Sequence, residues 1–277
     1  MKRIQILIVL LGVAALAAPA AALAVTQTVR LGHSTASFSY TVSKAKDGFE
    51  TYSNESLTIT RDGAVAYSAA VTDPNCGTGQ FGCDPGATGK QSSVRLVDID
   101  RSGEPNVVLN LFSGGANCCF IGQVFTYSAV LNGYVKNERT FGNAGYRLRQ
   151  LSQGGHYEFV TGNLGFAAAF TSDAASALPL QILSFVGLKF TDVTRSHPKL
   201  LRKDAAFWIK LFKANLKQGE GPLGAWAADE ELLGHNKLVQ ATLKQQLKAG
   251  NLVNGFINGK KYIAALNKLL RKLGYLK

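Results

Sequence analysis

The spacing of apolar residues changes near residue 193, and this change constrains the fold more than any other feature of the sequence. Before it, alternating and β-branched runs are separated by turn signals such as Arg61-Asp62-Gly63 and Leu131-Asn132-Gly133. This pattern is typical of antiparallel strands joined by tight turns. The predicted strands cover residues 36–42, 57–60, 64–71, 94–97, 107–111, 123–130, 158–161 and 182–190.

Beyond residue 193, apolar residues recur every three or four positions, which predicts amphipathic helices. Ser196 can cap the first helix, with Pro198 in its first turn, and a break at 219–222 ends it. The three later helices are predicted to cover residues 223–233, 238–248 and 260–272. The last third is therefore predicted to form a small helical domain or a helical cap on the β-rich part.

The first 24 residues have the three-part pattern of a cleavable secretory signal peptide. Lys2 and Arg3 come first, an apolar stretch follows, and Ala22-Leu23-Ala24 offers small residues where signal peptidase cleaves. We expect an exported chain that starts at Val25 and is secreted or extracytoplasmic. The alternative is an uncleaved anchor, because residues 4–24 could nearly span a bilayer. No later stretch is long and apolar enough, so we expect no transmembrane segment in the mature chain.

The positive charge lies in the last third of the chain. Residues 25–193 hold 12 basic and 13 acidic side chains, a net of −1, whereas residues 194–277 hold 16 basic and 5 acidic, a net of +11. We divide the chain into a signal peptide (1–24), a β-rich repeat domain (25–193) and a basic α-helical domain (194–277). This asymmetry favours an anionic envelope polymer or membrane surface as partner, and we expect no nucleic acid. The alternative is a solvated lysine face.

Four cysteines, an even number, predict two disulfides in an exported chain. Because a bond between the adjacent Cys118 and Cys119 is strained, we favour one bond from each of them to Cys76 and Cys83. The alternative is a zinc site, although the cysteine spacing departs from the usual zinc-ligand spacing.

Residues 94–108 align without a gap with residues 146–160, at an offset of 52 residues. Arg, Leu, Gly and the final Val recur in register. A period near 50 is typical of a propeller blade, but two copies are too few to close a ring. We therefore predict an α+β fold with an antiparallel, β-rich, propeller-blade-like N-terminal part in an open or sandwiched arrangement. A small α-helical C-terminal domain follows it.

The turn of the first repeat has oxygen-bearing residues at alternate positions, which is the spacing of a calcium loop. Asp98, Asp100 and Ser102 stand at positions 1, 3 and 5, and Asn106 stands at position 9. Gly103 supplies the sharp turn at position 6. The remaining predicted ligand is the backbone carbonyl of Glu104 at position 7.

Residues 97–106, followed by the Ser-Gly-Gly-Ala-Asn-Cys-Cys run at 113–119, resemble secreted bacterial proteins with FG-GAP or VCBS-type repeats. In those proteins a similar acidic loop joins two strands, and residues 170–195 are similar to uncharacterised members. The resemblance covers roughly residues 57–228. It implies a β-propeller-like module that can bind calcium and has no established enzymatic activity.

The loop departs from the family pattern where Ser102 and Asn106 replace carboxylates and where Arg101 adds a positive charge. We therefore expect weak calcium binding, because ligand charge tunes affinity. The alternative is a metal-free turn held by its own Asx hydrogen bonds.

No catalytic motif stands out, so we expect an exported non-enzymatic binding or structural module. The four histidines form no metal-binding pair, and no nucleophile elbow is present. The alternative is a secreted hydrolase acting on envelope polymer, with Asp98 and Asp100 as a carboxylate pair and His156 nearby.

Overall fold

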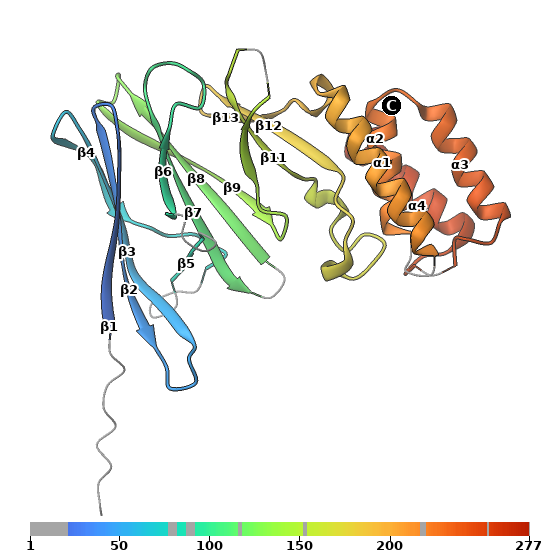
Figure 1. Cartoon of the computed structure of the whole chain (residues 1–277), viewed down its shortest axis with the longest axis horizontal. Coiled ribbons are helices and arrows are strands. Elements are labelled where there is room, and N and C mark those ends of the chain that lie inside the picture. Colours follow the sequence, from blue (N-terminus) through green and yellow to red (C-terminus); the bar gives the residue numbers. More distant parts are fainter. Residues whose placement is uncertain are drawn as a thin grey trace, which may run out of the picture.

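The structure is a computed structural model that describes residues 22–76, 82–86, 92–115, 118–151, 154–216, 220–253 and 255–276. Three antiparallel sheets come first along the chain and four helices follow, which confirms the predicted α+β fold class. The sheets lie one after another, and the helices lie beyond the third sheet (Figure 1). The predicted signal peptide lies outside the described residues, except for Ala22, Leu23 and Ala24, which begin the first strand.

Each sheet is built mainly from strands that follow one another along the chain. The first sheet contains β1 (Ala22–Leu31), β2 (Ser34–Lys44), β3 (Glu50–Arg61) and β4 (Ala64–Ala70). The second contains β5 (Asp84–Pro85), β6 (Val94–Val97), β7 (Asn106–Gly115), β8 (Cys118–Ser128) and β9 (Gly133–Gly142). The third contains β10 (Arg147–Gln150), β11 (Tyr157–Gly162), β12 (Leu180–Val186) and β13 (Lys189–Asp192). Over the described ranges these sheets form an open series and no closed propeller.

The second sheet is buried on both faces because its central strands carry apolar residues at consecutive positions. Val107, Leu109 and Leu111 of β7 pack in the core that the second sheet shares with the first. Val108 points to the opposite face, as strand alternation requires, and packs with Phe159 in the core shared with the third sheet. All five side chains are fully buried. β7 therefore joins the first and third sheets through one central layer.

The helical part is built around α2, which is buried along most of its length because it is rich in alanine and apolar residues. The helices are α1 (Pro198–Ala214), α2 (Gly221–Leu232), α3 (Asn236–Lys248) and α4 (Gly259–Lys272). Phe166 and Phe170, from the segment between β11 and β12, also pack in this core. That segment contains the short 3-10 helices η1 (Leu164–Phe166) and η2 (Asp173–Ala175). The helical core thus draws on residues that precede the helices in sequence.

The start of α1 differs from the prediction. Ser196 lies in a third short 3-10 helix, η3 (Thr194–Ser196), and His197 occupies the N-cap of α1 without a side-chain capping bond. Arg195 of η3 donates to the carbonyls of Leu232, Gly274 and Tyr275, at 3.2–3.3 Å. A guanidinium side chain therefore satisfies carbonyls at the C-terminal ends of α2 and α4.

Four strands were not predicted: β1, β5, β9 and β10. Each lies at the edge of its sheet. Edge strands expose one side and tolerate polar residues, so their apolar alternation is weak. The run predicted as one strand over 182–190 is a hairpin, because Gly187 and Leu188 adopt positive φ angles of 58° and 64° and form its turn.

The two copies of the repeat occupy equivalent places. The first copy forms the hairpin β6–β7 and the second forms the hairpin β10–β11. The β6–β7 hairpin contributes to the second sheet and the β10–β11 hairpin opens the third. The 52-residue offset therefore corresponds to one sheet of the series.

Candidate functional site

The predicted calcium loop is the turn between β6 and β7. Its side chains accept hydrogen bonds from its own backbone: Asp98 Oδ2 from Gly103 N (3.0 Å) and Asp100 Oδ1 from Ser102 N (3.2 Å). Ser102 Oγ accepts from Glu104 N at 3.3 Å. Gly103 has a φ of 84°, which lets the loop turn sharply as predicted.

The side chains of the last two predicted ligand residues, Glu104 and Asn106, make different contacts. Asn106 Oδ1 accepts from Ile99 N at 3.0 Å, which closes the base of the turn. The Glu104 carboxylate turns toward the first sheet, where it accepts from Arg61 at 2.9 Å and contacts His33 at 3.1 Å. The hydrogen bond from Arg61 holds the pKa of Glu104 below its usual value. Glu104 therefore links the second sheet to turns of the first.

These residues fit a calcium ion only in part. Calcium takes six to eight oxygen ligands, and the loop brings together two carboxylates, from Asp98 and Asp100. Asp98 Oδ1 is buried and has no hydrogen-bond partner in the part of the chain that the structure describes, so one carboxylate oxygen is available. Within the described ranges, no group of three or more His, Cys, Asp or Glu side chains could hold a metal. Calcium binding by this loop therefore stays a prediction.

The turn of the second repeat lies beside this loop. Arg101 Nε donates to the Gly155 carbonyl at 3.0 Å, which ties the two repeat turns together. Asp98, Arg101, Gln150 and Tyr157 are among the residues that line a cavity of about 530 Å³ in this region. Arg101, the basic residue of the loop, therefore makes a structural contact between the two repeat turns.

The disulfide pairing that we favoured from the sequence is wrong. Cys76 and Cys83 are bonded to each other, with their Cα atoms 5.1 Å apart. A turn after β4, in which Asp73 O accepts from Cys76 N at 3.1 Å, redirects the chain at the first cysteine. Cys119 is also disulfide-bonded, and the side chain of Cys118 lies outside the described residues. No described cysteine is free, so the zinc alternative has no described thiolate ligand.

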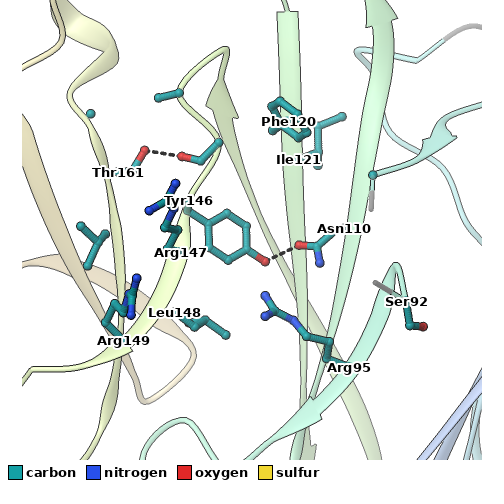
Figure 2. Close-up of a pocket in the computed structure, with 15 residues that line it drawn as sticks. Ser92, Arg95, Asn110, Phe120, Ile121, Tyr146, Arg147, Leu148, Arg149 and Thr161 are labelled. Atoms are coloured by element: carbon teal, nitrogen blue, oxygen red, sulfur yellow. Dashed lines mark hydrogen bonds between the residues drawn. The ribbon is translucent and has the colours of Figure 1, made fainter. Parts of the chain in front are cut away.

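A cavity of about 870 Å³ lies between the second and third sheets. Three arginines line it: Arg95 from β6, and Arg147 and Arg149 from β10. Figure 2 shows the Tyr146 ring between Arg147 on one side and Arg95 on the other. Among the described residues, none that lines the cavity carries a carboxylate. The cavity is therefore a positively charged pocket, which we call the arginine cleft.

Tyr146 is fixed at the centre of the arginine cleft. Its hydroxyl donates to Asn110 Oδ1, and its ring lies 4.4 Å from the Phe141 ring and 4.9 Å from the Phe159 ring. Burial raises the pKa of Tyr146 to about 12, although the Arg95 guanidinium opposes this shift. The hydroxyl is therefore neutral at physiological pH and remains a hydrogen-bond donor.

We did not predict the arginine cleft from the sequence, although the repeat contains a signal for it. Arg95 and Arg147 are the arginine that recurs in register in the two copies. Because the two hairpins belong to adjacent sheets, the repeated arginine lines the same cavity twice. The alignment revealed the recurrence, but only the packing of the sheets brings the two residues together.

The helical part exposes many basic side chains, which we call the basic helical surface. It consists of Lys199, Arg202, Lys203, Lys210 and Lys213 on α1, Lys237, Lys244 and Lys248 on α3, and Lys260, Lys261, Lys268, Arg271 and Lys272 on α4. None of these side chains forms an ion pair with a carboxylate of the described residues. Their charges are therefore exposed to solvent and uncompensated by close partners.

The acidic residues of the helical part are mostly withdrawn from its surface. Glu220, Asp229 and Glu231 are buried, at 0%, 0% and 5% exposure. Glu230 contacts His235 at 2.6 Å. Because four of the five acids of residues 194–277 lie on or beside the buried α2, they offset little of the charge at the surface.

The fifth acid, Asp204, joins α1 to the third sheet. Its Oδ2 accepts from Leu180 N at 3.0 Å and from Trp208 Nε1 at 2.8 Å. Burial is the main cause that raises the pKa of Asp229 to about 10, and the negative charge of Asp204 is the second. Asp229 is therefore a neutral carboxylic acid at physiological pH and does not reduce the positive charge of this part.

Three of the four histidines contact a glutamate, namely His33 with Glu104, His197 with Glu158 and His235 with Glu230. The His197–Glu158 distance is 3.3 Å, and the contact joins the start of α1 to β11. The fourth, His156, lies in the turn between β10 and β11. Asp98 and Asp100, the carboxylate pair of the hydrolase alternative, accept backbone hydrogen bonds within their loop.

Comparison with known proteins gave two relatives, and both are distant. The chain is 27% identical over 189 residues, 65% of its length, to an uncharacterized protein, y4bJ, of Sinorhizobium fredii. It is 29% identical over 154 residues, 51% of its length, to a probable thylakoid lumen protein, sll0997, of Synechocystis sp.. The matches span 28% and 44% of those two proteins. No family model matches, and no solved structure gives a significant match.

The Cys76–Cys83 disulfide and the lumenal name of one relative indicate an extracytoplasmic or lumenal location. This agrees with the predicted extracytoplasmic location. Among the described residues, no helix has both the length and the apolar character that crossing a membrane requires.

Proposed function

We propose that this protein is an exported, non-enzymatic binding or structural module whose basic helical surface contacts an anionic surface of the cell envelope. The observation that carries this proposal is the separation of charge within the helical part. Its basic side chains are exposed, whereas its acidic side chains are buried or engaged in contacts within the fold.

The physical basis is long-range attraction summed over many charges. A single exposed lysine interacts weakly with an anion, but a surface of thirteen basic side chains creates a potential that concentrates polyanions. Their lysine stems are flexible and suit a repetitive anionic partner better than one precise ligand. The predicted partner is therefore an envelope polymer or an anionic lipid surface.

Binding to two probes tests the proposal: vesicles of phosphatidylcholine with phosphatidylglycerol, and isolated anionic envelope polymer. The exported chain should sediment with at least one probe and should not sediment with pure phosphatidylcholine vesicles. Replacing Lys261, Lys268 and Lys272 of α4 with glutamine should weaken that binding.

A matched variant controls for net charge. Arg30, Lys46 and Lys189 are exposed basic residues of the first and third sheets and the turns between their strands. Replacing these three with glutamine removes the same charge but should leave binding nearly unchanged. Equal losses in the two variants, or no binding to either probe, would overturn the proposal.

We also propose that the β6–β7 loop binds calcium weakly. The buried, unpartnered Asp98 Oδ1 supports this proposal, because a cation would satisfy that oxygen. Millimolar calcium should raise the melting temperature of the wild type, and less so that of Asp98→Asn. An equal shift in both proteins, or no shift in either, would contradict it.

A further inference from the structure

We propose that the arginine cleft is a second binding site, separate from the basic helical surface, for a sugar that carries one carboxylate or phosphate group. The cleft lies between the second and third sheets, whereas the basic helical surface lies on α1, α3 and α4 (Figures 1 and 2). The two sites therefore depend on different residues.

The charge of the cleft selects an anion. Arg95, Arg147 and Arg149 contribute three guanidinium groups, and guanidinium forms strong paired hydrogen bonds to carboxylate and phosphate oxygens. Arg95 Nε is buried and has no hydrogen-bond partner among the described residues. A buried cationic donor without an acceptor is costly, and a bound anion would supply the acceptor.

The carboxylate that could have neutralised the cleft is engaged elsewhere. Glu158 lies directly across from Arg149 in the pairing of β10 with β11. Its side chain is only 7% exposed, and its Oε1 contacts His197 at 3.3 Å rather than forming an ion pair with Arg149. The exposed Arg147 and Arg149 therefore keep their donors available to a ligand.

The polar groups around the arginines suit a hydroxyl-rich body. Because Asn110 Oδ1 accepts from Tyr146, the amide Nδ2 group of Asn110 remains available as a donor. Thr161 donates to the Gly145 carbonyl at 2.6 Å and stabilises one wall (Figure 2). Leu148 and Phe120, both partly buried, add apolar surface on which the C–H face of a sugar ring can pack.

The size of the cleft argues for more than a bare inorganic anion. At about 870 Å³ it lies within the usual range for small-molecule sites, roughly 300–1,000 Å³. The packing of Tyr146 against Phe141 and Phe159 also fixes the centre of the site before binding. Such preorganisation reduces the entropy that a ligand must offset.

Isothermal titration of the exported chain with three matched sugars tests this inference. Glucuronate carries a carboxylate, glucose 6-phosphate carries a phosphate, and glucose is neutral. At least one of the two charged sugars should bind at millimolar concentration, and glucose should not. Tighter binding of glucuronate would identify a carboxylate ligand, and tighter binding of glucose 6-phosphate would identify a phosphate ligand.

Variants at the exposed arginines locate the binding. Replacing Arg147 and Arg149 with glutamine should weaken it about tenfold or more, since each charged hydrogen bond contributes strongly. Arg30→Gln, on β1, serves as the matched exposed control and should have no effect. The Lys261, Lys268 and Lys272 variant should retain full sugar binding, which separates this inference from the envelope proposal.

Three results would overturn the inference. Glucose could bind as tightly as the charged sugars, or neither charged sugar could bind. Alternatively, the Arg147 and Arg149 variant could keep wild-type affinity. Far-UV circular dichroism of each variant confirms that it is folded, and both arginine side chains are exposed, so their replacement leaves the core intact.

Discussion

Replacing Asp229 with asparagine should remove a large part of the pH dependence of stability. Asp229 is fully buried on α2, and burial together with the nearby Asp204 raises its pKa from 3.8 to about 10. The folded protein therefore keeps a proton on Asp229 at neutral pH, whereas the unfolded chain has lost it. Asparagine has nearly the same shape and no proton to lose over this range.

The sign and size of the effect follow from proton binding. Between the unfolded and folded pKa values of Asp229, the folded state holds one more proton than the unfolded state. Each pH unit in this window therefore lowers the free energy of unfolding by about 1.4 kcal/mol. From pH 6 to pH 8, wild type should lose about 2.7 kcal/mol more stability than Asp229→Asn.

Urea unfolding at these two pH values measures this difference directly, because it compares each protein with itself. Asp62→Asn, at an exposed turn where asparagine tolerates the positive φ of 51°, provides the control and should follow wild type. Parallel pH profiles for wild type and Asp229→Asn would refute a protonated Asp229 in the folded state.

Three further variants test other contacts. Glu104→Gln should cost about 0.5–1 kcal/mol at pH 7, because its pairs with Arg61 and His33 are partly exposed. The pKa of Glu104 is lowered mainly by Arg61, so urea unfolding should show this loss disappearing as the pH falls through that pKa. Replacing both Cys76 and Cys83 with serine should lower the free energy of unfolding by about 2–3 kcal/mol, as expected for a short closed loop; an unchanged urea midpoint would contradict this. Leu109→Ala, which empties a fully buried position on β7, should cost about 3 kcal/mol in the same assay, and a loss below about 1 kcal/mol would contradict its central place in the core.

Strong periodicity explains which parts of the fold could be predicted from the sequence. The four helices begin and end within a few residues of their predicted positions. In α1, α3 and α4 an apolar face lies opposite charged residues, whereas α2 is buried along most of its length. The two aligned segments, 94–108 and 146–160, form equivalent hairpins, although the strand β10 of the second was not predicted. The edge strands β1, β5, β9 and β10 were missed, because one-sided burial leaves too weak a pattern.

The candidate sites depend on tertiary packing, which the sequence shows only indirectly. The net charge of the last third was visible, but the burial of Glu220, Asp229 and Glu231 was not. That burial makes the helical surface more basic than composition implies. Likewise, Arg95 and Arg147 line one cavity because adjacent sheets pack together, and the sequence does not show this packing.

The most direct test of envelope binding is its salt dependence. The affinity of the exported chain for phosphatidylglycerol-containing vesicles and for anionic envelope polymer should be measured at about 0.1 M and about 1 M salt, where the Debye length falls from about 10 Å to about 3 Å. The account predicts binding at the lower concentration and a large loss at the higher one, with a smaller loss for the Lys261, Lys268 and Lys272 variant. Binding that is insensitive to salt and unchanged in that variant would contradict it.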